Sequence, residues 1–329
     1  MKAKILLLMG DTAGVGPELC TKVLADLPEN ASRAQIIVTG DLKVLQEAAG
    51  ATNTTINAPV VTTFNDVQSY GDAPIVIWNV PGEHEIPRKK VSREAGTEVL
   101  NNLMNAINLA KEGSIQGFVF APFNKQSMHL AGSNHYSELE LFKEQFSRAD
   151  IPGEFNVLDG LWVARVTSHI PVAEISATLN VERVYHTMEL LGEAQVQAGI
   201  TPVLAVAALN PHAGENGIFG NEENTIIKPA IERLRKDKPT WKIEGPIPAD
   251  TLFPQIQKMG GFTGVIGMYH DQLQIATKII GLERGVTFHP GMKVPIATAA
   301  HGTAFDIQGT GMVNHQALKN AVTIVLDMV

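Results

Sequence analysis

The sequence predicts an α/β protein built on a buried, mostly parallel β-sheet. Apolar runs of strand length recur along the chain, and amphipathic helix patterns separate several of them. Near-continuous apolar strands are typical of parallel sheets, because helices cover both faces of such a sheet. The expected strands lie at 5–9, 35–40, 73–78, 117–121, 162–167, 202–209 and 264–269.

Helices are expected where apolar residues recur at helical spacing. The clearest case is the 91–112 stretch, in which Val99, Leu103 and Ala106 fall on one face. The segment 281–311 is rich in Gly, Pro, Thr and His, and it is expected to be loop-like. The other predicted helices cover 17–27, 181–198, 223–236 and the chain from about 315.

Length and composition bound the class of protein. A chain of 329 residues has room for two domains, and without a Pro/Ser-rich linker such domains would share chain crossings. A formal charge of −8 and a pI near 5.7 argue against a general nucleic-acid or membrane-surface role. The single cysteine, Cys20, favours a reducing compartment, and no apolar stretch reaches membrane-spanning length. We therefore expect a cytoplasmic protein that binds neither nucleic acid nor membrane.

Two motifs at strand ends are candidates for ligand contacts. The glycines of Gly10–Glu18 (GDTAGVGPE) permit a tight turn and close approach of a ligand, but the motif matches neither the GxGxxG fingerprint nor a P-loop. Lys125, at the end of APFNK, is placed to bind a carboxylate or a phosphate. A plain strand-to-helix turn and a solvated lysine are the respective alternatives.

Three histidines stand in distinctive polar phrases: His169 in VTSHIP, His212 in LNPHAGE and His270 in GMYHDQ. Neutral imidazole is a common ligand of borderline metal ions, and three ligands leave coordination positions open for a substrate. Taken singly, a histidine at a strand end is more often a structural residue, so the residues alone leave both roles open. The same group includes Asp250, Asp271 and Lys278.

A glycine-rich loop, His301–Gly311 (HGTAFDIQGTG), follows in the C-terminal part. A loop of this kind can wrap an adenosine, with Asp306 accepting hydrogen bonds from ribose hydroxyls. A surface loop without a ligand is the alternative.

Together and in order, these phrases resemble the PdxA family of pyridoxine biosynthesis, the 4-hydroxythreonine-4-phosphate dehydrogenases and their close relatives. The resemblance runs essentially the whole chain, on GDTAGVGPE, APFNK, TSHIP, LNPHAGENGIFGNEE, PADTLF, MYHDQ and HGTAFDIQGTG. It implies the two-domain fold of isocitrate and isopropylmalate dehydrogenases. The implied cofactor-side domain covers 1–125 plus 270–329, and a metal, substrate and dimerisation domain covers 126–269, with approximate boundaries.

The resemblance also implies the ligands and a homodimer whose active site is shared between subunits. A divalent metal (Zn, Mn, Co, Ni or Mg) would be held by His169, His212 and His270, with one of them supplied by the partner subunit. NAD or NADP would lie against the loop at 301–311, which explains the missing GxGxxG. The implied cofactor-binding residues are Gly14, His301, Gly302, Thr303, Asp306 and Asn314.

The implied reaction is oxidation of the secondary alcohol of a hydroxy acid, with decarboxylation of the β-keto acid that results. A metal at the alcohol oxygen would stabilise the negative charge that develops there. Asp250, Asp271 and Lys278 are the candidates for proton transfer and for orienting metal or substrate, and which of them is the base stays open.

The substrate pocket departs from that of the biosynthetic enzymes. Where they carry Gly-His-Thr-Glu, this chain has Tyr136-Ser137-Glu138, with His135 one place early. Where they carry an Asn and an Arg for phosphate, it has Thr287 and Ile296, and loss of a bidentate anion donor changes recognition. The substrate-binding candidates are Tyr136, Ser137, Lys125, Lys278 and Thr287, with His289 and Lys293 as replacements for the lost phosphate contacts.

The expected function is therefore a metal- and NAD(P)-dependent dehydrogenase of 4-hydroxythreonine-4-phosphate or a related four-carbon acid phosphate, such as threonate or erythronate phosphate. The alternative within the family is a dehydrogenase of a cis-dihydrodiol carboxylate in catabolism. A metal-dependent hydrolase or phosphatase, which works without nicotinamide, and a non-catalytic ligand-binding relative are the alternatives of other classes.

Overall fold

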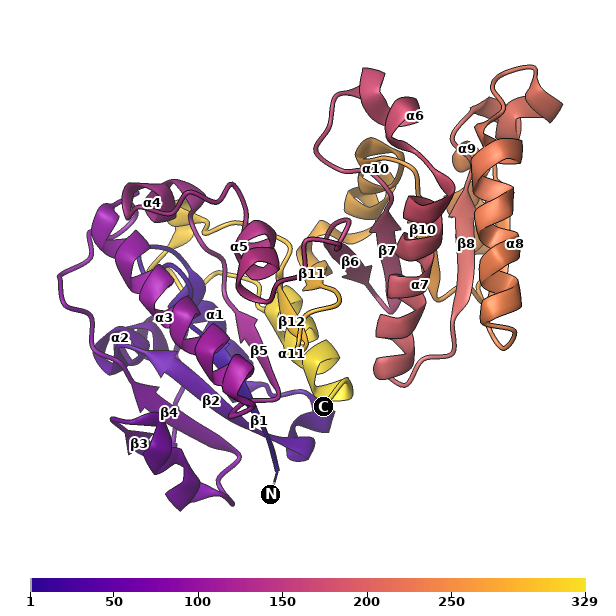
Figure 1. Cartoon of the computed structure of the whole chain (residues 1–329). Helices are drawn as coiled ribbons and strands as arrows, with labels where there is room; N and C mark the ends of the chain where they lie inside the picture. The colour runs from indigo at the N-terminus through magenta and orange to yellow at the C-terminus, as the bar shows by residue number, and fades with distance from the viewer. Residues whose placement is uncertain (1) are drawn as a thin grey trace. The chain divides into compact units, whose positions relative to one another are not determined.

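The computed structural model describes residues 2–329 and divides into two compact units (Figure 1). Unit 1 comprises Met1–Ala149, Val286–Phe288 and Met292–Val329, and unit 2 comprises Asp150–Gly285 and His289–Gly291. The chain crosses between the units more than once, as expected from the absence of a linker. The domain boundaries drawn from the sequence at 125 and 270 stay a prediction, whereas the division by contacts falls near 149 and 285.

Unit 1 is built on a parallel sheet in the order β3-β4-β2-β1-β5-β12, with β11 next to β12. Ile5 and Leu7 of β1 alternate with Leu6 and Leu8, and all four are buried, because helices cover both faces of the sheet. The strands are β1 (Ala3–Leu8), β2 (Ala34–Gly40), β3 (Val60–Val61), β4 (Ile75–Asn79), β5 (Gly117–Phe120), β11 (Val286–His289) and β12 (Ile296–Ala299).

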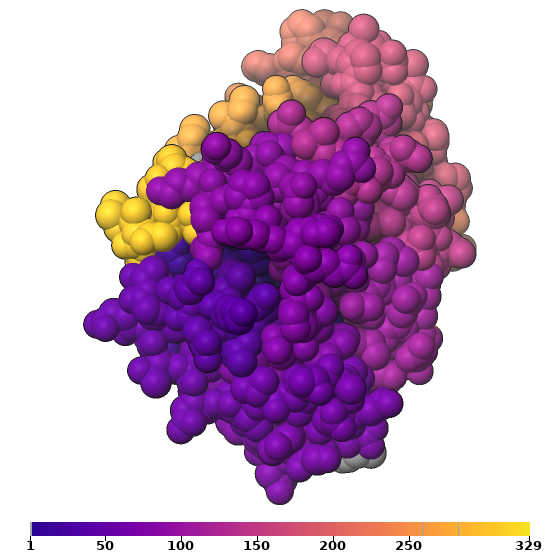
Figure 2. Space-filling model, turned by 90° about the vertical axis from the view of Figure 1, so that its left-hand side faces the viewer, coloured from indigo at the N-terminus to yellow at the C-terminus, as the bar shows by residue number. Residues whose placement is uncertain are grey.

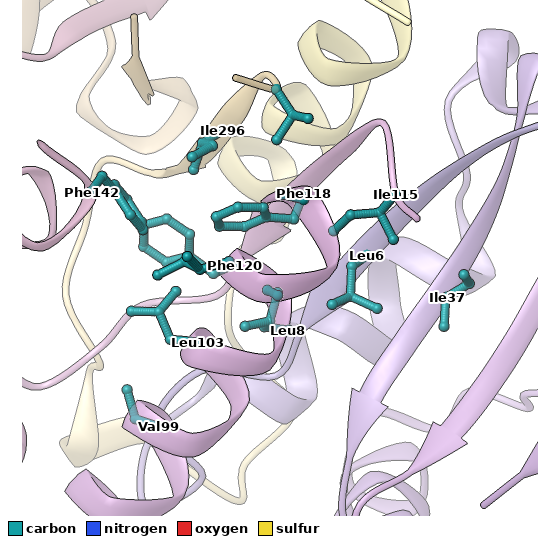
Figure 3. Close-up of a cluster of buried hydrophobic side chains, with 14 of the residues drawn as sticks. Leu6, Leu8, Ile37, Val99, Leu103, Ile115, Phe118, Phe120, Phe142 and Ile296 are labelled. Carbon is teal, nitrogen blue, oxygen red and sulfur yellow. The ribbon is translucent and has the colours of Figure 1, made fainter. Parts of the chain in front are cut away.

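The longest helix of unit 1, α3, forms where the apolar spacing predicts it. Its Ser92 N-cap accepts a hydrogen bond from Ala95 N at 3.1 Å, and Gly113 ends it in the left-handed conformation. Its buried face packs on side chains of β1, β2 and β5, as Figure 3 shows for Val99 and Leu103. The helices of unit 1 are α1 (Gly16–Ala25), α2 (Leu42–Thr52), α3 (Arg93–Glu112), α4 (Lys125–Leu130), α5 (Glu138–Gln145) and α11 (Gln316–Asp327), with short 3-10 turns η1 (Glu29–Arg33), η2 (Phe64–Tyr70) and η7 (Phe305–Ile307).

Figure 2 shows a face that is formed mainly by the N-terminal half of the chain, drawn from indigo to magenta.

The strands of unit 2 follow one another in the order β6-β7-β10-β8-β9, and only the β6–β7 pair is antiparallel among the pairings described. Apolar side chains of α9 and α10, among them Phe253 and Leu273, cover β7, β8 and β10, and α7 packs with α8. The strands are β6 (Phe155–Leu158), β7 (Leu161–Arg165), β8 (Val203–Ala207), β9 (Lys242–Ile247) and β10 (Gly264–Gly267). The helices are α6 (Ile175–Thr178), α7 (Val181–Gln197), α8 (Lys228–Asp237), α9 (Ala249–Met259) and α10 (His270–Gly281), with η3 (Val172–Glu174), η4 (Pro211–Gly217), the π-helix η5 (Glu223–Ile227) and η6 (Leu282–Arg284).

The α/β class with a mostly parallel buried sheet is confirmed. The expectation of a loop-like segment at 281–311 is wrong, because β11 and β12 lie within it. Both strands have four residues and include a Thr, and β11 also includes a His, so they lack the long apolar run that marks β1 or β2. In the part of the chain that the structure describes, no helix has the length and hydropathy needed to cross a membrane.

Candidate functional site

The three histidines follow three neighbouring parallel strands of unit 2. β10 lies between β7 and β8 and pairs in parallel with both. His169 comes four residues after Arg165, the last residue of β7; His270 begins α10 just after β10; and His212 lies in the segment that leaves β8. The carboxyl ends of parallel strands meet at one edge of a sheet, which is where α/β proteins bind ligands.

Two of the histidines come close together. The ring centroids of His169 and His270 lie 5.7 Å apart. Nδ1 of His270 lies 2.6 Å from a carboxylate oxygen of Asp271. A carboxylate that accepts the Nδ1 proton leaves the Nε2 lone pair free, which is the arrangement found beside metal-ligating histidines.

His212 occupies a strained segment. Five consecutive residues, His212 to Asn216, have positive φ values of 52°, 53°, 78°, 43° and 56°. Left-handed backbone costs about 1–2 kcal/mol per non-glycine residue, and such strain gathers at functional sites. The His212 side chain is 73% exposed, and its Nδ1 lies 3.7 Å from Glu215.

Glu223 holds the start of this strained segment. The residue is 1% exposed, and its Oε1 accepts hydrogen bonds from Leu209 N at 2.9 Å and Asn210 N at 2.7 Å. Its Oε2 accepts from Asn210 Nδ2 at 3.0 Å. A buried carboxylate satisfied by three N–H donors fixes the chain just before His212 and offsets part of the strain that follows.

The described residues contain no group of three or more His, Cys, Asp or Glu side chains arranged to hold a metal ion. The structure brings His169 and His270 together and does not bring His212 to them. Their donor chemistry fits a borderline divalent ion. Ligation by all three histidines stays a prediction.

Sequence reasoning missed Gln272, which ties these strand ends to one another. Its Oε1 accepts a hydrogen bond from Met268 N, and its Nε2 donates to Ala208 O, both at 2.6 Å. Thr167 adds a second tie, because its hydroxyl donates to Met268 O at 2.7 Å. The signal was available, since Gln272 closes the phrase MYHDQ, but a polar residue in the first turn of a helix is usually solvated.

The catalytic candidates lie on the two helices that follow β9 and β10. Asp250 stands in the first turn of α9, and Asp271 and Lys278 lie on α10. All three residues are exposed. Asp271 is the one with an observed contact to a candidate metal ligand, His270.

The glycine-rich loops of unit 1 pack against each other and form a cradle. Val15 N donates to Thr303 O at 3.0 Å, and a Cβ on Gly14 would lie 2.5 Å from that same carbonyl oxygen. Glu18, 2% exposed, accepts from Gly309 N at 2.5 Å and from Gly311 N at 2.8 Å. Beside them lies a cavity of about 220 Å³ lined by Gly14, Glu18, Arg88, Gln308 and Gly309, among others. The close approach at Gly14 is between two loops of the protein, which only glycine permits, and nucleotide binding beside these loops stays a prediction.

The other cofactor candidates lie at the rim of this loop. His301 is half-buried, with Nδ1 3.0 Å from Gly302 O, while Gly302 and Asp306 are exposed. A Cβ on Gly302 would meet no atom within 4 Å. Asn314 accepts a hydrogen bond from Gln316 N at 2.9 Å, at the start of α11.

The substrate candidates are divided between surface and interior. Lys125 begins α4 and is exposed, and Tyr136 is 86% exposed. Ser137 caps α5, because its hydroxyl accepts from Glu140 N at 3.3 Å. Thr287 is half-buried in β11, and Ile296 is fully buried in the unit 1 core.

The two proposed replacements for phosphate contacts are already engaged or buried. The ammonium group of Lys293 donates to Lys111 O at the end of α3. His289 is 2% exposed, and burial lowers its pKa to about 4, so its imidazole is neutral near pH 7. A neutral, buried imidazole is a poor substitute for the charge of an arginine.

Unit 1 also contains a buried carboxyl group, Asp11, and a half-buried one, Glu98, that the sequence did not single out. Burial raises the pKa of Asp11 to about 6 and that of Glu98 to about 7. The negative charges of Asp41 and Asp11 add to the effect at Glu98. One oxygen of each raised carboxyl, Asp11 Oδ2 and Glu98 Oε1, is buried without a hydrogen bond.

The fold and these sites define a class: an α/β protein with histidines at the strand ends of one unit and packed glycine-rich loops in the other. Residues 32–325 match the family described as "Pyridoxal phosphate biosynthetic protein PdxA". The chain belongs to the PdxA family.

Relatives with assigned names match nearly the whole chain. A Pasteurella multocida protein, provisionally named a 4-hydroxythreonine-4-phosphate dehydrogenase, is 39% identical over 99% of this chain and 97% of its own. The D-threonate 4-phosphate dehydrogenase of Bordetella bronchiseptica is 34% identical over 94% of this chain and 88% of its own.

Solved structures agree. The 4-hydroxythreonine-4-phosphate dehydrogenase of Klebsiella pneumoniae superposes with a TM-score of 0.82 at 30% identity, covering 100% of this chain and 99% of that one. A terephthalate 1,2-cis-dihydrodiol dehydrogenase of Burkholderia xenovorans reaches 0.70 at 24% identity over 99% and 98%, which shows a shared fold.

Proposed function

We propose that this chain is a metal- and NAD(P)-dependent dehydrogenase that oxidises the secondary alcohol of a four-carbon hydroxy acid phosphate, with decarboxylation of the product. The observation that carries the proposal is the His169–His270 pair at neighbouring strand ends, with Asp271 at Nδ1 of His270. The names of the Pasteurella, Bordetella and Klebsiella relatives support the same substrate class.

Two groups that this chain binds in the proposal supply the chemistry. His169, His270 and His212 would hold a divalent metal, which would supply Lewis-acid stabilisation of negative charge on the substrate oxygen. The loops at Gly14 and Thr303 would hold NAD(P), which would supply the hydride acceptor. The chain's own residues would orient the substrate and move the alcohol proton.

Proton transfer falls to the exposed candidates on α9 and α10. Asp271 is engaged with His270, so its proposed role is to fix the tautomer and orientation of that ring. Asp250 and Lys278 remain as the groups that take or return a proton, and Lys278 also offers positive charge to an acidic substrate. Lys125, Tyr136, Ser137 and Thr287 stay proposals as substrate contacts.

A homodimer with a shared site is part of the proposal. Exposed apolar side chains gather on the elements that carry the histidines: Ile275 and Ile279 lie one turn apart on α10 and are 60% and 80% exposed, and Phe219, near His212, is 51% exposed. Apolar side chains of this kind favour burial against another protein surface. The partner subunit would then supply the ligand that this chain alone does not bring to the pair. A cytoplasmic location is also proposed.

The test is hydride transfer measured as NADH or NADPH absorbance, with metal-loaded protein and three substrates: 4-hydroxythreonine-4-phosphate, D-threonate 4-phosphate and a cis-dihydrodiol carboxylate. We expect turnover of one of the phosphates. Turnover of the dihydrodiol alone would favour the second candidate; Ile296 does not distinguish the two, because it is buried in the core and cannot contact a substrate. Substrate turnover without nicotinamide would indicate a hydrolase, and cofactor binding without any turnover a non-catalytic relative.

A further inference from the structure

Arg165, the last residue of β7, carries a charge in a place where charges are rare. The residue is 2% exposed. Its counter-ion is Glu154, whose Oε1 lies 3.8 Å from Nη2, within ion-pair range but beyond hydrogen-bond distance. A buried guanidinium is tolerated where its charge is paired and its N–H groups are hydrogen-bonded.

The guanidinium donates in three directions. Nε donates to Ser168 Oγ at 3.2 Å, Nη1 to Asn156 Oδ1 at 2.5 Å, and Nη2 to Glu154 O at 3.2 Å. A planar fork with five N–H donors can make these bonds at once, whereas a lysine ammonium at the end of its stem cannot. Ser168 directly precedes His169, so the Nε hydrogen bond of Arg165 holds the loop that carries His169.

A second arm reaches the helix of the other histidine. Asn156 Oδ1 accepts not only from Arg165 but also from Gln274 Nε2, at 2.6 Å. Gln274 lies on α10 four residues after His270, and therefore one turn further along the same helix face. A continuous polar bridge thus runs from Ser168 through Arg165 and Asn156 to Gln274.

We infer that Arg165 is a positioning residue that sets the separation of His169 and His270. The inference rests on the proposed function, because it assigns the two rings to one metal. The bridge links Ser168, the residue before His169, to Gln274, one turn after His270. The hydrogen bonds of Thr167 and Gln272 hold the backbone at Met268, two residues before His270. Without the guanidinium, the spacing of the two rings is no longer fixed. Mutation of residues that hydrogen-bond to metal ligands typically lowers metal affinity by about 10–100-fold.

The experiment is calorimetric titration of the metal-free protein with Co²⁺, with the visible absorption of bound Co²⁺ as a second readout. Arg165→Met and Arg165→Lys should each weaken Co²⁺ binding by about tenfold or more, because neither restores the fork. Arg183→Met is the matched control, since Arg183 Nη2 donates to Val166 O at 3.4 Å at the same strand end without reaching α10. It should bind Co²⁺ as the wild type does.

Milder variants keep the inference testable if the Arg165 variants do not fold. Ser168→Ala removes the hydrogen bond to the guanidinium, and Gln274→Leu removes the hydrogen bond to Asn156, at opposite ends of the bridge. Their effects on Co²⁺ affinity should be non-additive in the double variant, because both act through the Arg165–Asn156 contact. Wild-type Co²⁺ affinity in folded Arg165→Met, or strict additivity of the two end variants, overturns the inference. His169→Ala and His270→Ala separate the two hypotheses, because undiminished Co²⁺ binding by both would refute the proposed metal site itself.

Discussion

Glu98 makes the stability of this protein depend on pH in an unusual direction. The carboxyl lies on α3, where burial first, then the charges of Asp41 and Asp11, raise its pKa from 4.5 to about 7. The folded state therefore holds this proton more tightly than the unfolded chain does. The stability it contributes is fully present below about pH 4.5 and is lost as pH rises through about 7.

Glu98→Gln should abolish that loss, because the amide has nearly the same shape and carries no charge. A shift of about 2.5 pKa units corresponds to about 3 kcal/mol at 1.36 kcal/mol per unit, which is an upper value for this site. We expect the variant and the wild type to have similar free energies of unfolding near pH 4.5. Near pH 8.5 the variant should be the more stable by up to about 3 kcal/mol.

Urea unfolding followed by far-UV circular dichroism at pH 4.5, 6, 7 and 8.5 measures the difference at fixed protein concentration. Glu112→Gln, at the exposed end of the same helix, is the control and should keep the wild-type pH dependence. A Glu98→Gln curve parallel to the wild type across the whole range would refute the reasoning. So would a variant that becomes less stable than the wild type as pH rises.

Three other substitutions test the sites directly. Asp271→Asn should weaken Co²⁺ binding by about tenfold in calorimetry, because it removes the carboxylate at Nδ1 of His270, and unchanged affinity would exclude that role. Gly14→Ala should raise the NADH dissociation constant at least about tenfold by fluorescence titration, because its Cβ would lie 2.5 Å from a carbonyl oxygen of the facing loop. The control, Gly50→Ala, places a Cβ in open space on α2 and should bind NADH normally. Ile296→Arg should lower the free energy of unfolding by more than about 3 kcal/mol, because it buries a cation in the core, and a fully stable variant would contradict the placement.

The sequence predicted the parts of the fold that rest on long apolar periodicity. The helix at 91–112 and the strands at 5–9 and 35–40 are present nearly as expected, because each buries a full face against neighbours. The strands β9 and β12 were not predicted, because KIEGPI is mostly exposed or half-buried and IATA is only four residues long. Their pairing is decided by partners distant in sequence, which a local pattern does not contain.

The sequence motifs that form the site could be predicted, but the contacts between their residues could not. The phrases placed His169 and His270 at strand ends, and the parallel order of β7 and β10 makes them neighbours. The roles of Gln272 and Arg165 escaped, because each depends on acceptors that lie far away in sequence or on another strand. A polar residue in an apolar run is visible in the sequence, whereas the partner that satisfies it is not.

The strained His212 segment and the Arg165 bridge show that the three histidines are held in place in different ways. His169 and His270 are held as a pair by side-chain bridges inside unit 2. Glu223 anchors the chain just before His212, Phe219 N donates to Gly214 O at 3.1 Å after it, and the exposed ring of His212 sits on left-handed backbone. Backbone strain of this kind gathers at functional sites. In the proposed homodimer, assembly would complete a site made of a preformed pair and a strained third donor, so the Co²⁺ affinity measured by calorimetry should rise with the protein concentration as dimers form.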